Sequence, residues 1–265
     1  MHKLGIHHMT ALETDPVTFV SLAAETGCQE VSVFAQSPGS GSRFPLVTRE
    51  NLAAVRSRLL DTGVSVANID AFIITPETDV AAFRPALELG AELGARGAVT
   101  ILYDRDESRV VDTLGGLCEV AETLALKIAF EFMALTPAWN SLRAAAALVE
   151  SIGRSNLVLD VDVLHLARSG GCPADVGEIE PGLIAHAQLC DVADLTVTAD
   201  YAAEAAANRL APGDGVFPLD AFLRALPRGT PLELEVPQPQ DRPPLERMQH
   251  AVTATRELLN AIGPD

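Results

Sequence analysis

Residues 127–165 read KIAFEFMALTPAWNSLRAAAALVESIGRSNLVLDVDVLH, and this stretch contains the unit on which the fold is built. It opens with an apolar run at Lys127–Met133. In Leu142–Ile152, apolar residues then recur at three- and four-residue spacing, and a second apolar run follows at Leu157–Asp162. The runs are typical of buried strands and the spacing is typical of an amphipathic helix. The stretch therefore predicts a strand, a covering helix and a parallel strand.

The alternation of a strand-like run with a helical segment occurs eight times along the chain. The other six runs are Lys3–His7, Glu30–Phe34, Val64–Ile69, Gly97–Leu102, Leu183–Leu189 and Pro231–Val236. The number favours closure into a (β/α)8 TIM barrel, an α/β fold, over an open doubly wound sheet. No Gly-x-Gly-x-x-Gly follows the first run, which weakens the dinucleotide-binding alternative. No linker-like stretch divides residues 1–265, so we expect a single domain.

Proline marks three expected helix starts. Asp15-Pro16, Thr75-Pro76 and Thr136-Pro137 each place a capping oxygen before a proline at the first helical position. A further helix is expected at Leu245–Ile262 from its apolar spacing. The longest segments without such spacing, 36–45 and 191–215, follow the second and seventh runs, at the end of a barrel where active sites are built.

The charge balance excludes several classes of partner and mechanism. The 265 residues include 19 Lys and Arg against 36 Asp and Glu, which gives a net charge of −17. Because a chain with this net negative charge repels the phosphate backbone of DNA and RNA, we expect no nucleic acid partner. The only lysines, Lys3 and Lys127, each begin a strand-like run, at the wrong end of a barrel strand for catalysis. A Schiff-base mechanism is therefore disfavoured.

Signals for export, membrane insertion and disulfide formation are also missing from the sequence. No basic and hydrophobic leader opens the chain, and no apolar run reaches about 18 residues. We therefore expect a cytoplasmic protein with no membrane partner. The four cysteines, Cys28, Cys118, Cys172 and Cys190, are too far apart for a CxxC pair and are expected to be free thiols.

Polar side chains interrupt four of the apolar runs near their carboxyl ends. Glu131, Asp162 and Glu235 belong to the fifth, sixth and eighth runs, and Gln188 belongs to the seventh. Singly, each carboxylate is more simply a structural group bonded to backbone N–H groups. Together, three carboxylates at one barrel rim must take up protons or hold a cation. Because all four ligands would be oxygen atoms, the sequence favours one Mg²⁺ or Mn²⁺ ion over Zn²⁺.

In their order along the chain, these patterns resemble the xylose isomerase-like TIM barrels, a family of sugar phosphate isomerases and epimerases. The family's Asp-x-x-His, His-x-Gln and Arg-x-x-Pro-Gly-x-Gly patterns match residues 162–165, 186–188 and 209–215. Its glutamates on strands five and eight match Glu131 and Glu235. The resemblance covers essentially the whole chain, and it implies the barrel fold and assembly into homo-oligomers.

The resemblance also implies roles for individual residues. The metal ligands would be Glu131, Asp162, Gln188 and Glu235, and substrate oxygens would be held by His165 and Arg209, with His186 as a further substrate contact. Side-chain alternation along the first run places either His7 or His8 at the mouth, and His7 is taken as a candidate substrate contact. Two positions depart from the family, because Ser32-Val33 and Pro137 stand where glutamates are usual.

The predicted function is that of a divalent-metal-dependent isomerase or epimerase of a small keto-sugar, keto-polyol or related hydroxy-carbonyl compound. A cation on the carbonyl and its neighbouring hydroxyl would favour an enediolate. Glu131 and Glu235, on well-separated strands, would remove and return the proton. The same chemistry fits a lyase similar to dehydroshikimate dehydratases, in which a β-hydroxyl is expelled. A catalytically inert, ligand-binding barrel is the alternative from another class.

Overall fold

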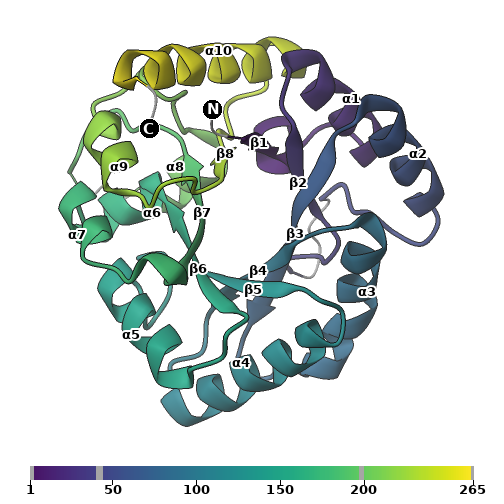
Figure 1. The fold of residues 1–265 in the computed structure, drawn as a ribbon, viewed down its shortest axis with the longest axis vertical. Coiled ribbons are helices and arrows are strands. Elements are labelled where there is room, and N and C mark those ends of the chain that lie inside the picture. Colours follow the sequence, from purple (N-terminus) through teal and green to yellow (C-terminus); the bar gives the residue numbers. More distant parts are fainter. Residues whose placement is uncertain (1–2, 40–43, 197–199, 264–265) are drawn as a thin grey trace.

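A computed structural model describes residues 3–39, 44–196 and 200–263 of the chain. In this part of the chain, eight parallel strands form a closed barrel in which β8 pairs with β1 (Figure 1). The strands are β1 (Leu4–His7), β2 (Glu30–Phe34), β3 (Ser65–Ile74), β4 (Gly97–Leu102), β5 (Lys127–Glu131), β6 (Leu157–Asp162), β7 (Ile184–Leu189) and β8 (Leu232–Leu234). The predicted (β/α)8 TIM barrel is confirmed.

Helices surround the strands, most of them as an outer ring (Figure 1). They are α1 (Pro16–Thr26), α2 (Leu52–Thr62), α3 (Arg84–Leu93), α4 (Glu107–Glu122), α5 (Leu142–Ile152), α6 (Val163–Arg168), α7 (Pro173–Gly177), α8 (Tyr201–Ala207), α9 (Leu219–Ala225) and α10 (Pro244–Ile262), with short 3-10 turns η1 (His8–Ala11), η2 (Val80–Phe83) and η3 (Pro181–Leu183). In the described part of the chain, no helix is long and apolar enough to cross a membrane.

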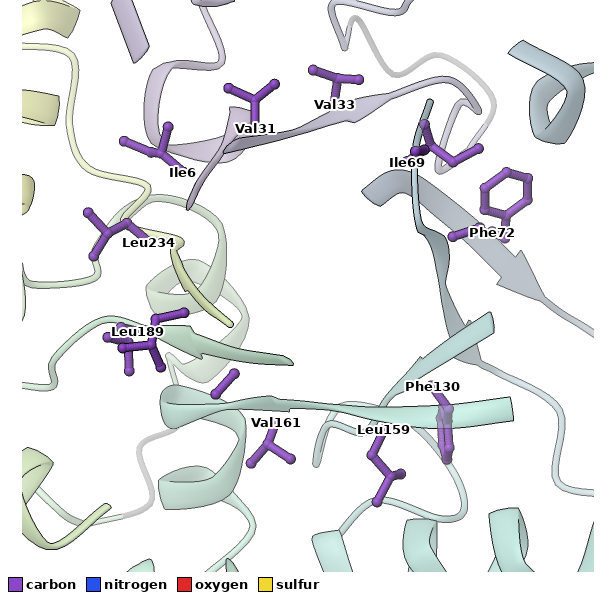
Figure 2. Close-up of a cluster of buried hydrophobic side chains, with 14 of the residues drawn as sticks. Ile6, Val31, Val33, Ile69, Phe72, Phe130, Leu159, Val161, Leu189 and Leu234 are labelled. Carbon is purple, nitrogen blue, oxygen red and sulfur yellow. The ribbon is translucent and has the colours of Figure 1, made fainter. Parts of the chain in front are cut away.

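The main hydrophobic core lies between the barrel and the helices. Figure 2 shows strand side chains that point away from the barrel axis, among them Ile6, Val31 and Leu234. Because side chains alternate along a strand, their neighbours point into the barrel. Ser32 and Glu233 are two such neighbours, and the Ser32 hydroxyl donates a hydrogen bond to the Glu233 carboxylate. The inner face of the barrel is therefore partly polar, whereas the outer face is apolar.

The two ends of the described chain are held together on one side of the barrel. Helix α10 packs against α1 and η1, next to the pairing of β1 with β8. Arg247 of α10 is 2% exposed, and its guanidinium forms an ion pair with Glu13 and donates to the Arg242 carbonyl. Residues from both ends of the sequence thus close the barrel.

The helix starts agree with the sequence only in part. Helix α1 begins at Pro16, where Asp15 accepts hydrogen bonds from two backbone N–H groups, as expected. The helix starts predicted at Thr75-Pro76 and Thr136-Pro137 are wrong. The Thr136 hydroxyl donates to the Met133 carbonyl instead of accepting as a cap, and α5 begins only at Leu142. The Thr75 oxygen caps a turn, and the next helical segment starts after Asp79, which accepts from the Ala81 N–H.

The strands and cysteines follow the expectations with one large difference. The third strand was expected at Val64–Ile69, whereas β3 continues to Ile74. The extension is held at Asp70, whose carbonyl accepts the backbone N–H groups of Ala35 and Gln36 at 2.8 and 3.0 Å. The four cysteines are free thiols, as predicted.

Candidate active site

A cavity of about 230 Å³ opens at the carboxyl ends of the strands. The polar residues that line it are His7, Asp70, Glu131, His165, Gln188, Arg209 and Glu235. All of them are buried, and they come from segments spread over most of the chain. Of the predicted site residues, only Asp162 and His186 do not line this cavity, and Asp162 lies directly against it through Arg209.

Asp162 and His165 are placed together by the start of α6. Asp162 ends β6 and caps the helix by accepting the backbone N–H of His165 at 2.9 Å. The first turn of α6 then brings the His165 imidazole to Glu131, with Nε2 at 3.1 Å from Oε1. Ligand atoms of Glu131, Asp162 and His165 all lie within 4.8 Å of one another, which is a spacing that suits a metal ion. The Asp-x-x-His spacing thus brings Asp162 and His165 together beside Glu131.

Arg209 places a positive charge at this centre. Its Nη1 lies 2.5 Å from Asp162 Oδ2 and 3.4 Å from Glu235 Oε2, and its side chain is 3% exposed. Burial alone would raise the pKa of Asp162, but Arg209 and His165 outweigh burial and lower that pKa below its ordinary value. Asp162 is therefore ionised, and Arg209 balances part of the charge of the carboxylates.

Gln188 and Glu235 each carry a buried oxygen that accepts no hydrogen bond from the described residues. The Gln188 Nε2 donates to Glu233 Oε2 at 3.3 Å, which leaves Gln188 Oε1 without a hydrogen bond among the described residues. Glu235 Oε2 also has no hydrogen bond there, and burial raises the pKa of Glu235 despite the nearby Arg209 and His7. A buried carbonyl oxygen and a buried carboxylate oxygen that accept no hydrogen bond are ligands that a hard divalent cation takes. The residues therefore fit the predicted cation.

His7 lies between two carboxylates, whereas His8 is a core residue. The Nε2 and Nδ1 atoms of His7 lie 3.3 Å from Asp70 Oδ2 and 3.4 Å from Glu235 Oε1. Burial disfavours a charge on His7, but Asp70 and Glu235 outweigh it and raise its pKa to about 10. His8 stacks on Phe19 at 4.1 Å between ring centroids, and burial lowers its pKa to about 3. His7 is therefore the histidine that faces the mouth.

His186 lies deeper in the barrel than the sequence suggests. Its Nε2 is 3.1 Å from Asp160 Oδ2 and 3.3 Å from Asn68 Nδ2. It lines a second cavity of about 390 Å³ at the amino ends of the strands, where the rim is formed by the ion pair of Arg96 with Glu30. A substrate contact at the mouth does not fit this position, because the side chain opens toward the opposite end of the barrel.

Two residues of the site were missed by the sequence analysis. Asp70 lies beyond the expected end of the third strand, and a longer alternating pattern would have included it. Tyr201 of α8 lies in the long segment after β7, and its hydroxyl is 2.6 Å from His165 Nδ1. Burial raises the pKa of Tyr201 above its ordinary value, so the phenol stays protonated. Tyr201 and Glu131 therefore hold the two nitrogens of the His165 ring from opposite sides.

Asp191, at the end of β7, is a structural carboxylate. Its two oxygens accept the backbone N–H groups of Val192, Gly213, Gly215 and Phe217 at 2.8–3.1 Å. A Cβ at Gly215 would lie 2.3 Å from the Val192 carbonyl oxygen, so the backbone approach requires glycine here. The Pro-Gly-x-Gly segment is thus a loop wrapped around Asp191, and it follows directly after Arg209.

The fold and this centre together define a TIM barrel with a buried acidic centre around Arg209 at the carboxyl ends of its strands, where barrel active sites lie. The chain belongs to the xylose isomerase-like TIM barrel family, whose model matches residues 20–258. No curated protein matches the sequence.

Several solved structures share the fold. IOLI protein with a bound zinc atom is 19% identical, with a TM-score of 0.83 and coverage of 99% of this chain and 100% of that one. The 3-keto-D-glucoside 4-epimerase YcjR from E. coli is 16% identical, with a TM-score of 0.76 and coverage of 97% and 100%. The probable 3-DHS dehydratase AsbF from Bacillus anthracis is 13% identical, with a TM-score of 0.77 and coverage of 96% and 98%.

Proposed function

We propose that this protein is a divalent-metal-dependent isomerase or epimerase of a small hydroxy-carbonyl compound, a class that includes keto-sugars and keto-polyols. The observation that carries the proposal is the buried centre in which Glu131 and Asp162 lie with Gln188 and Glu235, two residues that each carry a buried oxygen accepting no hydrogen bond from the described residues. Glu131, Asp162, Gln188 and Glu235 would hold the cation. An all-oxygen set suits Mg²⁺ or Mn²⁺, although a relative binds zinc and His165 lies close enough to supply a nitrogen.

The chain's own residues supply proton transfer and orientation. A bound divalent cation polarises a carbonyl and its neighbouring hydroxyl and makes the C–H of the hydroxyl-bearing carbon acidic. Glu131 and Glu235, from β5 and the segment after β8, remove and return that proton. His165, whose two ring nitrogens contact the Tyr201 hydroxyl and Glu131, holds the Glu131 carboxylate in position for this transfer.

Glu235→Gln tests the proton-transfer role. The amide keeps an oxygen and nearly the same volume but cannot act as a base, so turnover should fall by about 10²–10⁴ while ligand still binds. Exchange of solvent deuterium into the substrate measures the same step without product analysis. His165→Ala is the comparison variant: it should weaken activity through orientation and, with the four-oxygen ligand set, leave cation affinity intact, whereas a fall in cation affinity would identify His165 as a further ligand. Unchanged deuterium exchange in Glu235→Gln would contradict the assignment.

A dehydratase is the second candidate for the same site, since both epimerase and dehydratase activities occur among the structures that share this fold. Elimination of a β-hydroxyl needs the same proton abstraction. The mass of the product separates the two, because loss of one water lowers it by about 18 units and isomerisation leaves it unchanged. Absence of both bound cation and deuterium exchange with any hydroxy-carbonyl compound would favour a ligand-binding barrel without catalysis.

A further inference from the structure

The mouth cavity is divided into a polar half and an apolar half. Among the described residues that line it, every polar side chain belongs to the centre described above. The opposite side, which we call the apolar wall, comprises Met9, Phe34, Phe44, Ile73, Ile101 and Met133. These residues come from η1, from β2 to β4, and from the segments that follow β2 and β5. Among the described residues, the reacting centre thus lies mainly on the side of β5 to β8 and β1, and the side of β2 to β4 offers a hydrogen-bonding side chain to the cavity only at Asp70.

The apolar wall includes a pair of aromatic rings near the centre. The rings of Phe34 and Phe44 have centroids 4.7 Å apart at an interplanar angle of 58°. Phe34 also contacts His7 edge to face, with centroids 5.3 Å apart. The rim beside α8 adds Ala202, Ala205 and Ala206, which likewise offer no polar side chain. A ligand bound at the polar centre therefore projects its body between aromatic, aliphatic and alanine surfaces.

This division restricts what the body of a substrate can be. A keto-sugar or keto-polyol bears a hydroxyl on nearly every carbon, and each hydroxyl buried against the apolar wall would lose its water without gaining a partner. An unsatisfied buried hydroxyl weakens binding by about tenfold. A methylene in the same place strengthens binding by about fourfold. The apolar wall therefore strengthens the binding of ligands with an apolar ring relative to the binding of ligands whose ring carries several hydroxyl groups.

We propose that the substrate is an α-hydroxy ketone whose reacting carbons belong to, or are attached to, an apolar ring with few hydroxyl groups. This inference rests on the proposed function for its reacting end, and on the apolar wall for its body. It narrows the hydroxy-carbonyl class by placing free ketoses and fully hydroxylated keto-polyols among the poor ligands.

A matched pair of ring ketones tests the inference. 2-Hydroxycyclohexanone and pentahydroxycyclohexanone share the six-membered ring, the ketone and the neighbouring hydroxyl, and they differ only in the other hydroxyls. We expect the first to bind the Mg²⁺-loaded protein at least about tenfold more tightly in ligand-observed NMR titrations. Equal or tighter binding of the polyhydroxylated ring would overturn the inference, as would failure of both rings to bind.

Variants of the wall show whether it causes the preference. Ile101→Thr keeps the β-branched shape and adds a hydroxyl, so the ratio of the two affinities should fall about fourfold or more. Ile73→Thr provides the same test at a neighbouring position if the first variant does not fold. Leu60→Thr is the control, because Leu60 is 84% exposed and outside the cavity, and its ratio should equal that of the wild type. An unchanged ratio in a folded wall variant would contradict the proposal.

Titration of the ligand-free protein with Mg²⁺ or Mn²⁺ separates this inference from the proposed function. If no cation binds but the apolar ring is still preferred, the metal-dependent function fails and the assignment of the wall stands. If a cation binds and the polyhydroxylated ring is preferred, the wall assignment fails and the metal-dependent function stands.

Discussion

Replacement of Arg209 by Met removes the positive charge between the buried carboxylates and keeps a long side chain in its place. Asp162 and Glu235 would then lose the guanidinium that lies 2.5 and 3.4 Å from them. Removal of one partner from a buried ion pair costs about 3–5 kcal/mol, because the remaining charge, here that of Asp162, stays buried without its partner. We expect the free energy of unfolding of Arg209→Met, measured by urea titration without divalent cation, to fall by that amount.

Divalent cation should restore much of this loss. A cation at 100 times its dissociation constant stabilises a protein by about 2.7 kcal/mol. In Arg209→Met the cation no longer competes with the guanidinium, so it should bind more tightly and stabilise the variant more than the wild type. The measurement is the urea midpoint at increasing Mg²⁺ or Mn²⁺ concentration.

Arg168→Met is the matched control for this experiment. The Arg168 side chain is 1% exposed and pairs with Glu204 at 2.6 Å, so its loss also leaves a carboxylate without its partner. Glu204 is not one of the proposed ligands, so added cation should stabilise Arg168→Met no more than the wild type. If added cation restores the free energy of unfolding equally in both variants, or in neither, the reasoning that Asp162 and Glu235 belong to a cation site is refuted.

Further variants test other parts of the structure. Gln188→His should shift cation preference toward Zn²⁺ or Co²⁺ in competition binding, because imidazole is the softer donor, and an unchanged order would mean that Gln188 is not a ligand. Asp191→Asn presents an NH₂ group to two of the four backbone N–H groups, which should lower the unfolding free energy by about 2–6 kcal/mol in urea titrations. Glu30→Gln should destabilise the protein more at pH 7 than at pH 3. Burial alone would raise the pKa of Glu30, but Arg96 outweighs it and lowers that pKa below 4.5, so the carboxylate's contribution is present above that value and lost as the pH falls through its folded pKa. A loss in Glu30→Gln that does not depend on pH would contradict the role of this ion pair.

The sequence predicts the barrel because each strand is a short apolar run between segments with helical spacing. It also places Glu131, Asp162 and Glu235 at one rim, since the carboxyl ends of parallel strands in a barrel all face the same way. The helix starts at Thr75 and Thr136 are wrong because a threonine oxygen before proline serves a turn as well as it serves a helix. Local pattern alone does not separate the two outcomes.

The depth at which a side chain lies within the barrel is harder to predict from the sequence than the face of the strand from which it points. His186 and Gln188 are two residues apart and so point to the same face of β7, but they differ by about 6.6 Å along the strand. That distance places Gln188 at the mouth and His186 at the second cavity. Tyr201 could not be predicted because its contact with His165 joins positions far apart in the sequence and depends on how the segment after β7 folds back.

Closure of the barrel through β1 and β8 has a consequence for the order in which the protein acquires its site. His7 and Glu235, which meet in the cavity, are contributed by the first strand and by the segment after the last strand. During synthesis, β1 emerges from the ribosome long before its partner β8 exists, and its edge must wait for a neighbour from the other end of the chain. Pairings of such long sequence separation form late and slowly. Nascent chains that end before β8 thus have neither a closed barrel nor the His7–Glu235 contact, and the candidate site is among the last parts of the molecule to be assembled.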